Sequence, residues 1–387
     1  MPRARVRALM ARAARIAVPI APAIASAISL APAIAEAAAI ERSVPSTSRI
    51  LFETGRYGEF GTTWIAARQN GIGADLSPLG TPAVLDGRTG NMFDAMWSLD
   101  GALKADLGER LSFALILDQP YGARTTYPGG GTPVAAFYGG TLARLDTWEA
   151  SGILAWDVTP SLKAYAGLRA QWLEARADIP FMAGYTVRGR GDWGMGYVAG
   201  LAFERPEIAF RAALTYGSAI RHRLATAEST ALAHQSGTTA IDTPQAVTFE
   251  IQSGIAPRTL AFGSLRWVEW SDFSIDPMLY REMIGEPLVE YSGDGWTWTA
   301  GLAHQLTDAL AGALSVTYEP TTGGKLTTLG PQDGRASATA ALSYDFGAAN
   351  LTGGVTWGRI GDTRNGLDTR FDDGSALGLG LRLGVSF

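Results

Sequence analysis

The sequence predicts an all-β protein, a fourteen-stranded antiparallel transmembrane β-barrel preceded by a short N-terminal plug segment. Three observations lead to this fold. Residues 374–387 alternate, with every odd position from Leu377 to Phe387 apolar and the positions between them small or polar. Similar alternation recurs in segments of about ten residues, and the connections between the segments are tight and long in turn. Apolar faces repeated around a closed sheet require lipid as their solvent.

Residues 1–37 have the three parts of a secretory signal peptide. Five arginines precede the charge-free stretch 16–35, and small residues suited to cleavage lie within 35–39. The alternative is a membrane-spanning helix, since the apolar stretch is about 20 residues long. Because Pro19, Pro22 and Pro32 interrupt the stretch, we expect export with removal of the segment.

The composition limits the partners and cofactors. The chain has no cysteine, so neither a disulfide nor a thiolate metal site is available. Removal of residues 1–37 takes away five arginines and one glutamate and changes the formal net charge from −5 to −9. A net acidic chain without clusters of Lys and Arg argues against nucleic acid as a partner.

The alternating segments define fourteen expected strands within the barrel domain, residues 56–387. They lie near 57–67, 93–107, 111–118, 148–158, 162–172, 195–203, 208–216, 247–251, 261–270, 296–306, 310–318, 338–346, 351–357 and 374–387. The last strand is expected to pair with the first and close the barrel, and its terminal Phe387 is the kind of residue that the barrel-assembly machinery recognises.

The connections sort by length. Tight turns are expected at 108–110, 159–161, 205–207, 256–258, 307–308 and 347–350, and long loops at 68–91, 119–146, 173–194, 218–245, 271–294, 320–334 and 359–373. Short periplasmic turns and long outer loops are typical of a bacterial outer-membrane barrel. A soluble β-sandwich has no reason to keep all long loops at one end. Both chain ends are then expected to be periplasmic.

The side-chain pattern agrees with a membrane barrel. Aromatic residues gather near strand ends, as interface girdles do: Trp97, Trp148, Trp156, Trp172, Tyr216, Trp267, Trp296, Trp298, Tyr318, Tyr344 and Trp357. Charged residues of both signs fall on the inward positions. The basic ones are Lys104, Lys163, Arg169, Arg211, Arg266, Arg335 and Arg382, and the acidic ones are Asp94, Asp100, Asp106, Glu149, Asp157, Glu204, Glu250, Glu319 and Asp345. A polar interior suits a lumen and would disrupt a soluble core.

Three stretches of the chain have a distinctive sequence. The first, residues 111–128, contains Pro120-Tyr121-Gly122. The others are residues 213–224 and residues 243–277, the last of which begins with Thr243-Pro244. With the strand count and the aromatic C-terminus, these stretches resemble the FadL-type outer-membrane transporters of long-chain fatty acids and other hydrophobic compounds. The resemblance extends from about residue 50 to the end of the chain.

The resemblance implies a lumen blocked by an N-terminal hatch and a lateral exit at a kink in the third strand. Strand three here is the 111–118 segment, and a gap beside residues 118–122 agrees with the inability of Pro120 to donate a ladder hydrogen bond. The alternative is that Pro120 simply begins an outer loop. The hatch would be short, residues 38–55, and Ser46-Thr47-Ser48 stands where the family has Asn-Pro-Ala. Residues 43–52 could form a short helix.

The expected substrate path follows from these features. In the ninth strand, Phe262 and Trp270 fall on the inward parity, unless a bulge at Gly263 turns Phe262 back toward lipid. Arg266 and Arg211 could pair with a fatty-acid carboxylate, or with Glu250 and Glu204 across the strands. The complete expected path is Leu51, Phe52, Asp118, Pro120, Tyr121, Arg211, Phe262, Arg266, Trp267 and Trp270.

No motif indicates catalysis, a cofactor or a metal. The histidines, His222, His234 and His304, have no G-x-S-x-G element or metal-type spacing beside them. The glycines of residues 189–194 spell a dinucleotide fingerprint, and residues 190–192 spell Arg-Gly-Asp, without a strand–helix unit around them. Asp368, Asp372 and Asp373 could touch calcium or the ions that bridge lipopolysaccharide, or form a solvated loop.

The expected function is passive outer-membrane transport of long-chain fatty acids or similar hydrophobic compounds, by a monomer that is not an enzyme. Molecules would be captured among the outer loops and released laterally near strand three. The expected surroundings are outer-membrane lipid and lipopolysaccharide. The alternatives are a general diffusion porin for small polar solutes and a surface adhesin-like barrel whose loops bind a partner.

Overall fold

The computed structural model describes residues 40–42, 47–323 and 325–387. The expected signal peptide, residues 1–37 with cleavage within 35–39, lies outside the described residues, as does part of the expected plug segment 38–55. Among the described residues, no helix is long and apolar enough to cross a membrane.

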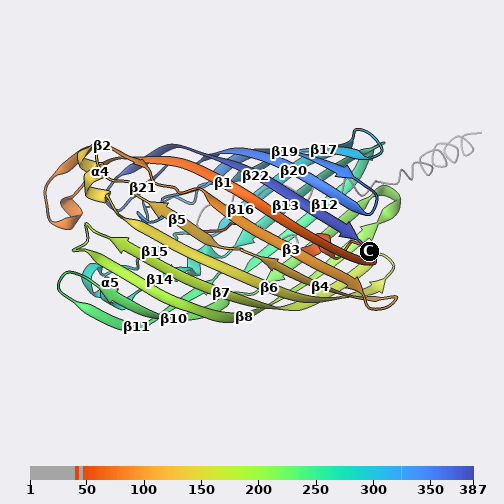
Figure 1. Cartoon of the computed structure of the whole chain (residues 1–387), viewed down its shortest axis with the longest axis horizontal. Coiled ribbons are helices and arrows are strands. Elements are labelled where there is room, and N and C mark those ends of the chain that lie inside the picture. Colours follow the sequence, from red (N-terminus) through yellow and green to blue (C-terminus); the bar gives the residue numbers. More distant parts are fainter. Residues whose placement is uncertain (1–39, 43–46, 324) are drawn as a thin grey trace, which may run out of the picture.

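Fourteen long strands form the closed wall of a barrel in the described chain (Figure 1). In order they are β1 (Arg56–Asp75), β3 (Met96–Asp106), β4 (Leu111–Asp118), β6 (Leu142–Thr159), β7 (Leu162–Ile179), β8 (Tyr185–Arg205), β9 (Phe210–Gly217), β12 (Ala246–Ala256), β13 (Thr259–Val268), β16 (Gly295–Gln305), β17 (Leu310–Glu319), β19 (Arg335–Asp345), β20 (Ala349–Ile360) and β22 (Arg370–Ser386). Each pairs antiparallel with the next, which confirms the predicted fold class.

The terminal strand closes the barrel as the alternation predicts. β22 pairs with β1 from Tyr57 opposite Ser386 to Ile72 opposite Arg370, and the Phe387 N–H donates to the Arg56 carbonyl (3.0 Å). The leucines at odd positions of β22 face outward and are exposed. One strand therefore carries both the apolar outer surface and the closing register.

The remaining elements lie between the wall strands along the chain. They are α3 (Thr47–Ile50), η1 (Ser77–Leu79), β2 (Val84–Asn91), β5 (Gly122–Thr126), α4 (Pro133–Tyr138), η2 (Pro206–Ile208), β10 (Ile220–Ser229), β11 (His234–Thr243), η3 (Trp270–Asp272), β14 (Ser274–Ile275), α5 (Met278–Ile284), β15 (Val289–Glu290), β18 (Lys325–Leu326) and β21 (Thr363–Asn365). Most gather at the end of the barrel opposite the C-terminus (Figure 1), which we call the long-loop end. The other end is the short-turn end.

Several expected loops consist partly or largely of strands. In the expected loop 68–91, β1 continues to Asp75 and pairs with β2. β7 and β8 run through most of the expected loop 173–194 and are joined by a turn at residues 180–184. The expected loop 218–245 is the β10–β11 hairpin, and β10 pairs with β8. In these parts the strands continue, but their outward residues are polar. The apolar alternation that marks a lipid-facing strand therefore stops earlier along the chain than the strand itself.

The inward charges are paired in the structure. Every basic residue expected on an inward position has a carboxylate partner: Lys104–Asp106, Lys163–Asp157, Arg169–Glu149, Arg211–Glu204, Arg266–Glu41, Arg335–Glu319 and Arg382–Asp100. Charges removed from bulk water require such partners. Six of these seven partners come from the wall itself, whereas Glu41 comes from the N-terminal segment.

Candidate functional site

Strand three is broken at residues 119–121, which we call the strand break. β4 ends at Asp118 and β5 begins at Gly122, and both pair with the continuous β6. Asp118 lies opposite Glu149 and Gly122 opposite Asp146, so three residues of strand three face two residues of β6. The extra residue is a bulge, and Pro120 within it has no N–H to donate. Pro120 thus lies inside a broken strand and does not begin an outer loop.

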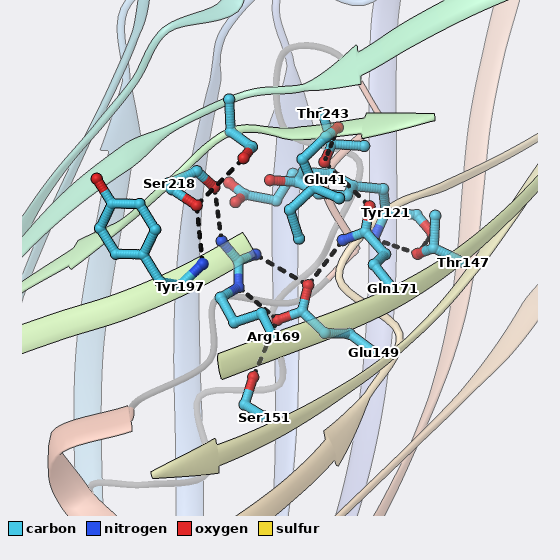
Figure 2. Close-up of polar contacts among 12 residues, drawn as sticks. Glu41, Tyr121, Thr147, Glu149, Ser151, Arg169, Gln171, Tyr197, Ser218 and Thr243 are labelled. Atoms are coloured by element: carbon cyan, nitrogen blue, oxygen red, sulfur yellow. Dashed lines mark hydrogen bonds and ion pairs between the residues drawn. The ribbon is translucent and has the colours of Figure 1, made fainter. Parts of the chain in front are cut away.

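Tyr121 is held away from β6 by a side chain. The Tyr121 N–H donates to Thr147 Oγ1 (2.9 Å), and the same hydroxyl donates to the Tyr121 carbonyl (2.7 Å; Figure 2). A threonine side chain between two strands spaces them more widely than a direct ladder bond. Thr147 lies on the inward parity of β6 and is fully buried, so the displacement is toward the interior. The Tyr121 ring packs edge-on against Trp270, with centroids 5.9 Å apart.

The break leaves part of the wall without main-chain pairing. Residues 101–106 of β3 pair with residues 112–117 of β4, and within the described residues this ladder does not extend to residues 96–100. The Leu99 N–H donates there to the side chain of Gln119 (3.1 Å). Main-chain bonds resume beyond the break, where the Asp94 N–H donates to the Arg124 carbonyl (3.2 Å). Strand three and β3 are therefore separated over a short window bordered outside by the exposed Trp97.

Residues 40–42, here called the covering segment, pair with the free edge of the break. The Arg42 N–H donates to the Pro120 carbonyl (2.8 Å), and the Gly122 N–H donates to the Ile40 carbonyl (2.7 Å). Glu41 lies opposite Tyr121 in an antiparallel bridge. The segment thus behaves as a very short additional strand beside the window.

Two ion pairs hold the covering segment in place. Arg266 donates to Glu41 Oε1 through Nη2 (2.6 Å) and Nε (3.1 Å), and both side chains are buried. Arg42 Nη2 donates to Asp146 Oδ1 (3.1 Å) and to the Leu145 carbonyl (3.3 Å). The Arg42 guanidinium passes over Gly122, where a Cβ would come within 1.8 Å of Arg42 Nε. Any side chain at residue 122 would therefore displace the Arg42 guanidinium.

A polar network lies beside the break on the short-turn side (Figure 2). Arg169 donates twice to Glu149, at 2.7 and 2.9 Å, and Gln171 donates to the same carboxylate at 2.7 Å. Gln171 in turn accepts from Thr243 (3.0 Å). Glu149 and Arg169 border, together with Asp118 and Arg266, a cavity of about 540 Å³, counting the space open to solvent, whose lining is polar and apolar in about equal parts. We call it the polar cavity.

A second, larger cavity lies toward the long-loop end. It measures about 820 Å³, counting the space open to solvent, and we call it the apolar cavity. Its lining includes Ile40, Leu145, Leu224, Ile241, Leu288 and Tyr291. Burial raises the pKa of Tyr291, so its phenol stays neutral. Because Ile40 lines the apolar cavity and Tyr121 the polar one, the covering segment and the break lie between the two.

The loop that carries Trp270 is anchored by Asp294. Asp294 accepts from the Trp267 indole (2.9 Å) and from the Ser271 hydroxyl (2.6 Å). Burial alone would raise the pKa of Asp294, but these hydrogen bonds outweigh it and leave the pKa below its ordinary value. The anchor holds the Trp270 ring in its contact with Tyr121.

Leu51 and Phe52 lie near the short-turn end. α3 is a single turn, shorter than the expected helix over 43–52, of which residues 43–46 lie outside the described residues. Ile50 and Leu51 are fully buried among inward side chains of the wall, including Ala114 and Ile153. Phe52 packs against the Arg211 guanidinium, whose Cζ lies 4.5 Å from the centroid of the Phe52 ring.

The remaining expected path residues are divided between the two faces of β13. Its register with both neighbours is unbroken through Gly263, so the bulge alternative is wrong and Phe262 lies inside the barrel. Trp267 lies opposite Trp296 on the outward face and does not line the interior. Arg211 pairs with Glu204, whereas Arg266 pairs with Glu41 of the covering segment in place of the expected Glu250.

Three residues of the site were not predicted from the sequence: Glu41, Arg42 and Thr147. Thr147 follows the alternation of β6, so its inward direction could have been read from the sequence. Its bond to Tyr121 could not, because an inward threonine is common in a polar lumen. Glu41 and Arg42 could not be found by hydrophobic periodicity, because so short a segment contains no repeat.

The other motifs noted in the sequence lie in paired or regular structure. Within the described residues, no group of His, Asp and Glu could hold a metal ion. Asp368, Asp372 and Asp373 each pair with an arginine. Buried His222 bonds Gln171 (3.0 Å), and residues 189–194 lie within β8.

Comparison with known proteins places the fold. A family model of outer membrane protein transport proteins (OMPP1/FadL/TodX) matches residues 83–352. A Pseudomonas aeruginosa FadL homologue has 16% identity and a TM-score of 0.71, covering 88% of this chain and 92% of that one. The Ralstonia pickettii toluene transporter TbuX has 14% identity and a TM-score of 0.61, covering 87% and 91%. The P. putida toluene transporter TodX has 13% identity and a TM-score of 0.61, with the same coverage. A search of curated protein sequences finds no match.

Proposed function

This chain belongs to the outer membrane protein transport family (OMPP1/FadL/TodX), and from that membership we propose that it passively conducts long-chain fatty acids or similar hydrophobic compounds. The long-loop end faces the exterior and both chain ends face the periplasm. The observation that carries the proposal is the strand break, where Tyr121 is held inward and covered by residues 40–42.

Capture takes place in the apolar cavity. Leu224, Ile241 and Leu288 remove apolar surface of the ligand from water, which favours binding by about 25 cal/mol per Å² of buried area. Ile40 forms part of the cavity wall, so a bound ligand touches the covering segment directly.

Release takes place laterally because the axial route is polar. Beyond the covering segment a ligand would meet the Glu149–Arg169 pair and its hydrogen-bonded neighbours. An apolar molecule that displaced those partners would leave buried charges unpaired, which is costly. The window beside Trp97 and Leu99 leads instead from the apolar cavity toward lipid.

The covering segment acts as the gate. Two main-chain hydrogen bonds and the Glu41–Arg266 and Arg42–Asp146 ion pairs hold it against the break. When it leaves, Arg266 loses its carboxylate partner. A fatty-acid carboxylate can take that place, whereas a neutral hydrocarbon cannot.

The test is uptake by cells that lack their own transporter of this type and express this chain. Labelled oleate and a labelled neutral hydrocarbon of similar size are compared at limiting concentration. The proposal expects uptake above that of the empty vector, and the ratio of the two ligands reports whether a carboxylate contributes. Uptake no faster than the vector, together with a large salt-proportional current in planar bilayers, would instead identify a general diffusion porin.

A further inference from the structure

Four arginines lie side by side across four strands near the long-loop end. Arg124 of β5 pairs with Arg144 of β6, Arg144 with Arg176 of β7, and Arg176 with Arg188 of β8. Directly opposite residues in an antiparallel sheet have Cβ atoms about 5 Å apart. The four side chains, which we call the arginine row, therefore form one continuous line of like charge.

The arginine row is on the outward face of the wall. On β6 and β7 the odd positions, including Leu145 and Leu173, are buried inside the barrel, so Arg144 and Arg176 point outward. The same face carries Trp148 opposite Trp172 and Trp172 opposite Trp193, here called the tryptophan row. Figure 1 shows β6, β7 and β8 running side by side toward the long-loop end.

The tryptophan row sets the height of the arginine row above the membrane. Tryptophan rings lie at the head-group level of a bilayer. Arg144 precedes Trp148 by four residues, which is about 13 Å along a strand. For strands tilted by about 40°, this is about 10 Å along the membrane normal. With the long-loop end outside, as in the proposed function, the arginine row lies beside the sugars and phosphates of the outer leaflet.

Within the described part of the chain, the two central arginines are without a side-chain partner. Among the described residues, neither Arg144 nor Arg176 makes a hydrogen bond or ion pair through its side chain, and Arg144 Nε is buried without a partner. At the ends of the row, Arg124 donates to Asp146 (3.0 Å) and Arg188 lies 3.8 Å from Asp178.

The surrounding charge remains positive. Asp146 is shared between Arg42 and Arg124 and is therefore already neutralised. On the outward face of β5 to β8, this end carries five arginines, including exposed Arg190, against three carboxylates: Asp146, Glu174 and Asp178. Directly opposed like charges destabilise a sheet unless an anion lies between them.

We propose that the arginine row binds the phosphate groups of lipopolysaccharide, the phosphorylated glycolipid of the outer leaflet. Arg144 and Arg176 bind one phosphate between them, because adjacent guanidinium groups can donate several hydrogen bonds to its oxygens. The acyl chains of the same lipid pack below against the tryptophan row. Arg124, Arg144 and Arg176 also belong to the strands that wall the apolar cavity, but the phosphate binds on their outward face, away from the transported compound.

The first test titrates folded protein in detergent with purified lipopolysaccharide and counts bound molecules by native mass spectrometry. The R144Q/R176Q double variant is expected to bind about fivefold more weakly for each charge removed. Arg359→Gln is the matched control, because Arg359 is also exposed on the outward face, two residues from Trp357, but already pairs with Asp373 (3.3 Å). Equal binding by wild type and double variant, or an equal loss in the control, overturns the proposal.

The second test uses wild-type protein only, so it does not depend on the folding of a variant. Intact and dephosphorylated lipopolysaccharide are compared as ligands, with phosphatidylglycerol vesicles as competitor. Intact lipopolysaccharide is expected to bind more tightly and to resist displacement. Equal affinity for the dephosphorylated form, or displacement by phosphatidylglycerol at equal concentration, shows that the row does not recognise lipopolysaccharide phosphate.

Discussion

The Thr147 hydroxyl satisfies both backbone hydrogen-bonding groups of Tyr121, the residue at which strand three turns into the barrel. A side chain here replaces the backbone of β6 as the partner of strand three. This substitution lets the strand bend inward without leaving a buried N–H or carbonyl unpaired, which would cost about 1–3 kcal/mol for each group.

Replacing Thr147 should therefore destabilise the barrel at the break. Thr147→Val keeps the shape but removes the hydroxyl, and we expect the free energy of unfolding to fall by about 1–3 kcal/mol. Urea unfolding in lipid vesicles measures this change. Thr147→Ser is the control and should stay close to wild type, since it keeps the hydroxyl. A valine variant as stable as the serine variant would contradict the role of this bond.

A side chain at Gly122 should displace the covering segment. The added Cβ of Gly122→Ala would lie 1.8 Å from Arg42 Nε, so the guanidinium must shift, and we expect this shift to weaken its bond to Asp146. The chain has no cysteine, so Ile40→Cys reports the movement through labelling by a thiol reagent. We expect faster labelling and faster ligand uptake.

Gly152→Ala is the matched control for that experiment, because its Cβ would meet Phe113 only at 3.8 Å, an ordinary contact. Labelling of Ile40→Cys at the same rate in both alanine backgrounds would show that Gly122 does not hold the passage open.

Substituting one partner of the Glu41–Arg266 pair should loosen the gate more than substituting both partners. Removing one partner of a buried ion pair typically costs about 3–5 kcal/mol, because it leaves the other charge unpaired. We expect Glu41→Gln to raise Ile40→Cys labelling strongly, and the double variant E41Q/R266Q to recover part of the wild-type protection. Additive effects of the two substitutions in a double-mutant cycle would show that the pair is not coupled.

The Trp270 loop should loosen in acid. A carboxyl whose pKa is lower in the folded protein contributes stability that is present above its unfolded value of 3.8 and is lost as the pH falls through the folded value. The ¹⁹F resonance of fluorotryptophan at position 270 should therefore shift or broaden as the pH falls through the folded pKa of Asp294, which lies below 3.8. In Asp294→Asn the signal should be independent of pH. The same titration in both proteins would exclude Asp294 as the anchor.

Substitution of Phe387 should impair assembly and leave ligand binding intact. Its ring is 72% exposed on the outside of the barrel, far from both cavities, while its N–H closes the register with Arg56. We expect Phe387→Ala to lower the fraction of folded protein in the outer membrane. Ligand binding per folded molecule should equal wild type. Normal assembly of the variant would contradict the role of the terminal residue.

The strand break shows where reasoning from the sequence reaches its limit. Pro120 is visible as a residue that cannot complete a ladder, so a disturbance of strand three could be predicted. Its direction depends on Thr147, which lies 27 positions along the chain from Pro120 in the numbering and shares no local pattern with it. The prediction of loops at 173–194 and 218–245 was wrong for a related reason. Strands that extend beyond the membrane lack the apolar alternation from which the membrane strands were predicted.

The sequence by itself determined the barrel, because alternation has a fixed period of two and each apolar face requires lipid. It determined the strand count, the charged inward positions and the closing role of residues 374–387. Only the tertiary structure decided which charges meet: Arg266 with Glu41, 225 residues apart, and four arginines in one row. Those contacts depend on the register between strands, and register results from packing around the whole barrel, not from the order of residues within any one strand.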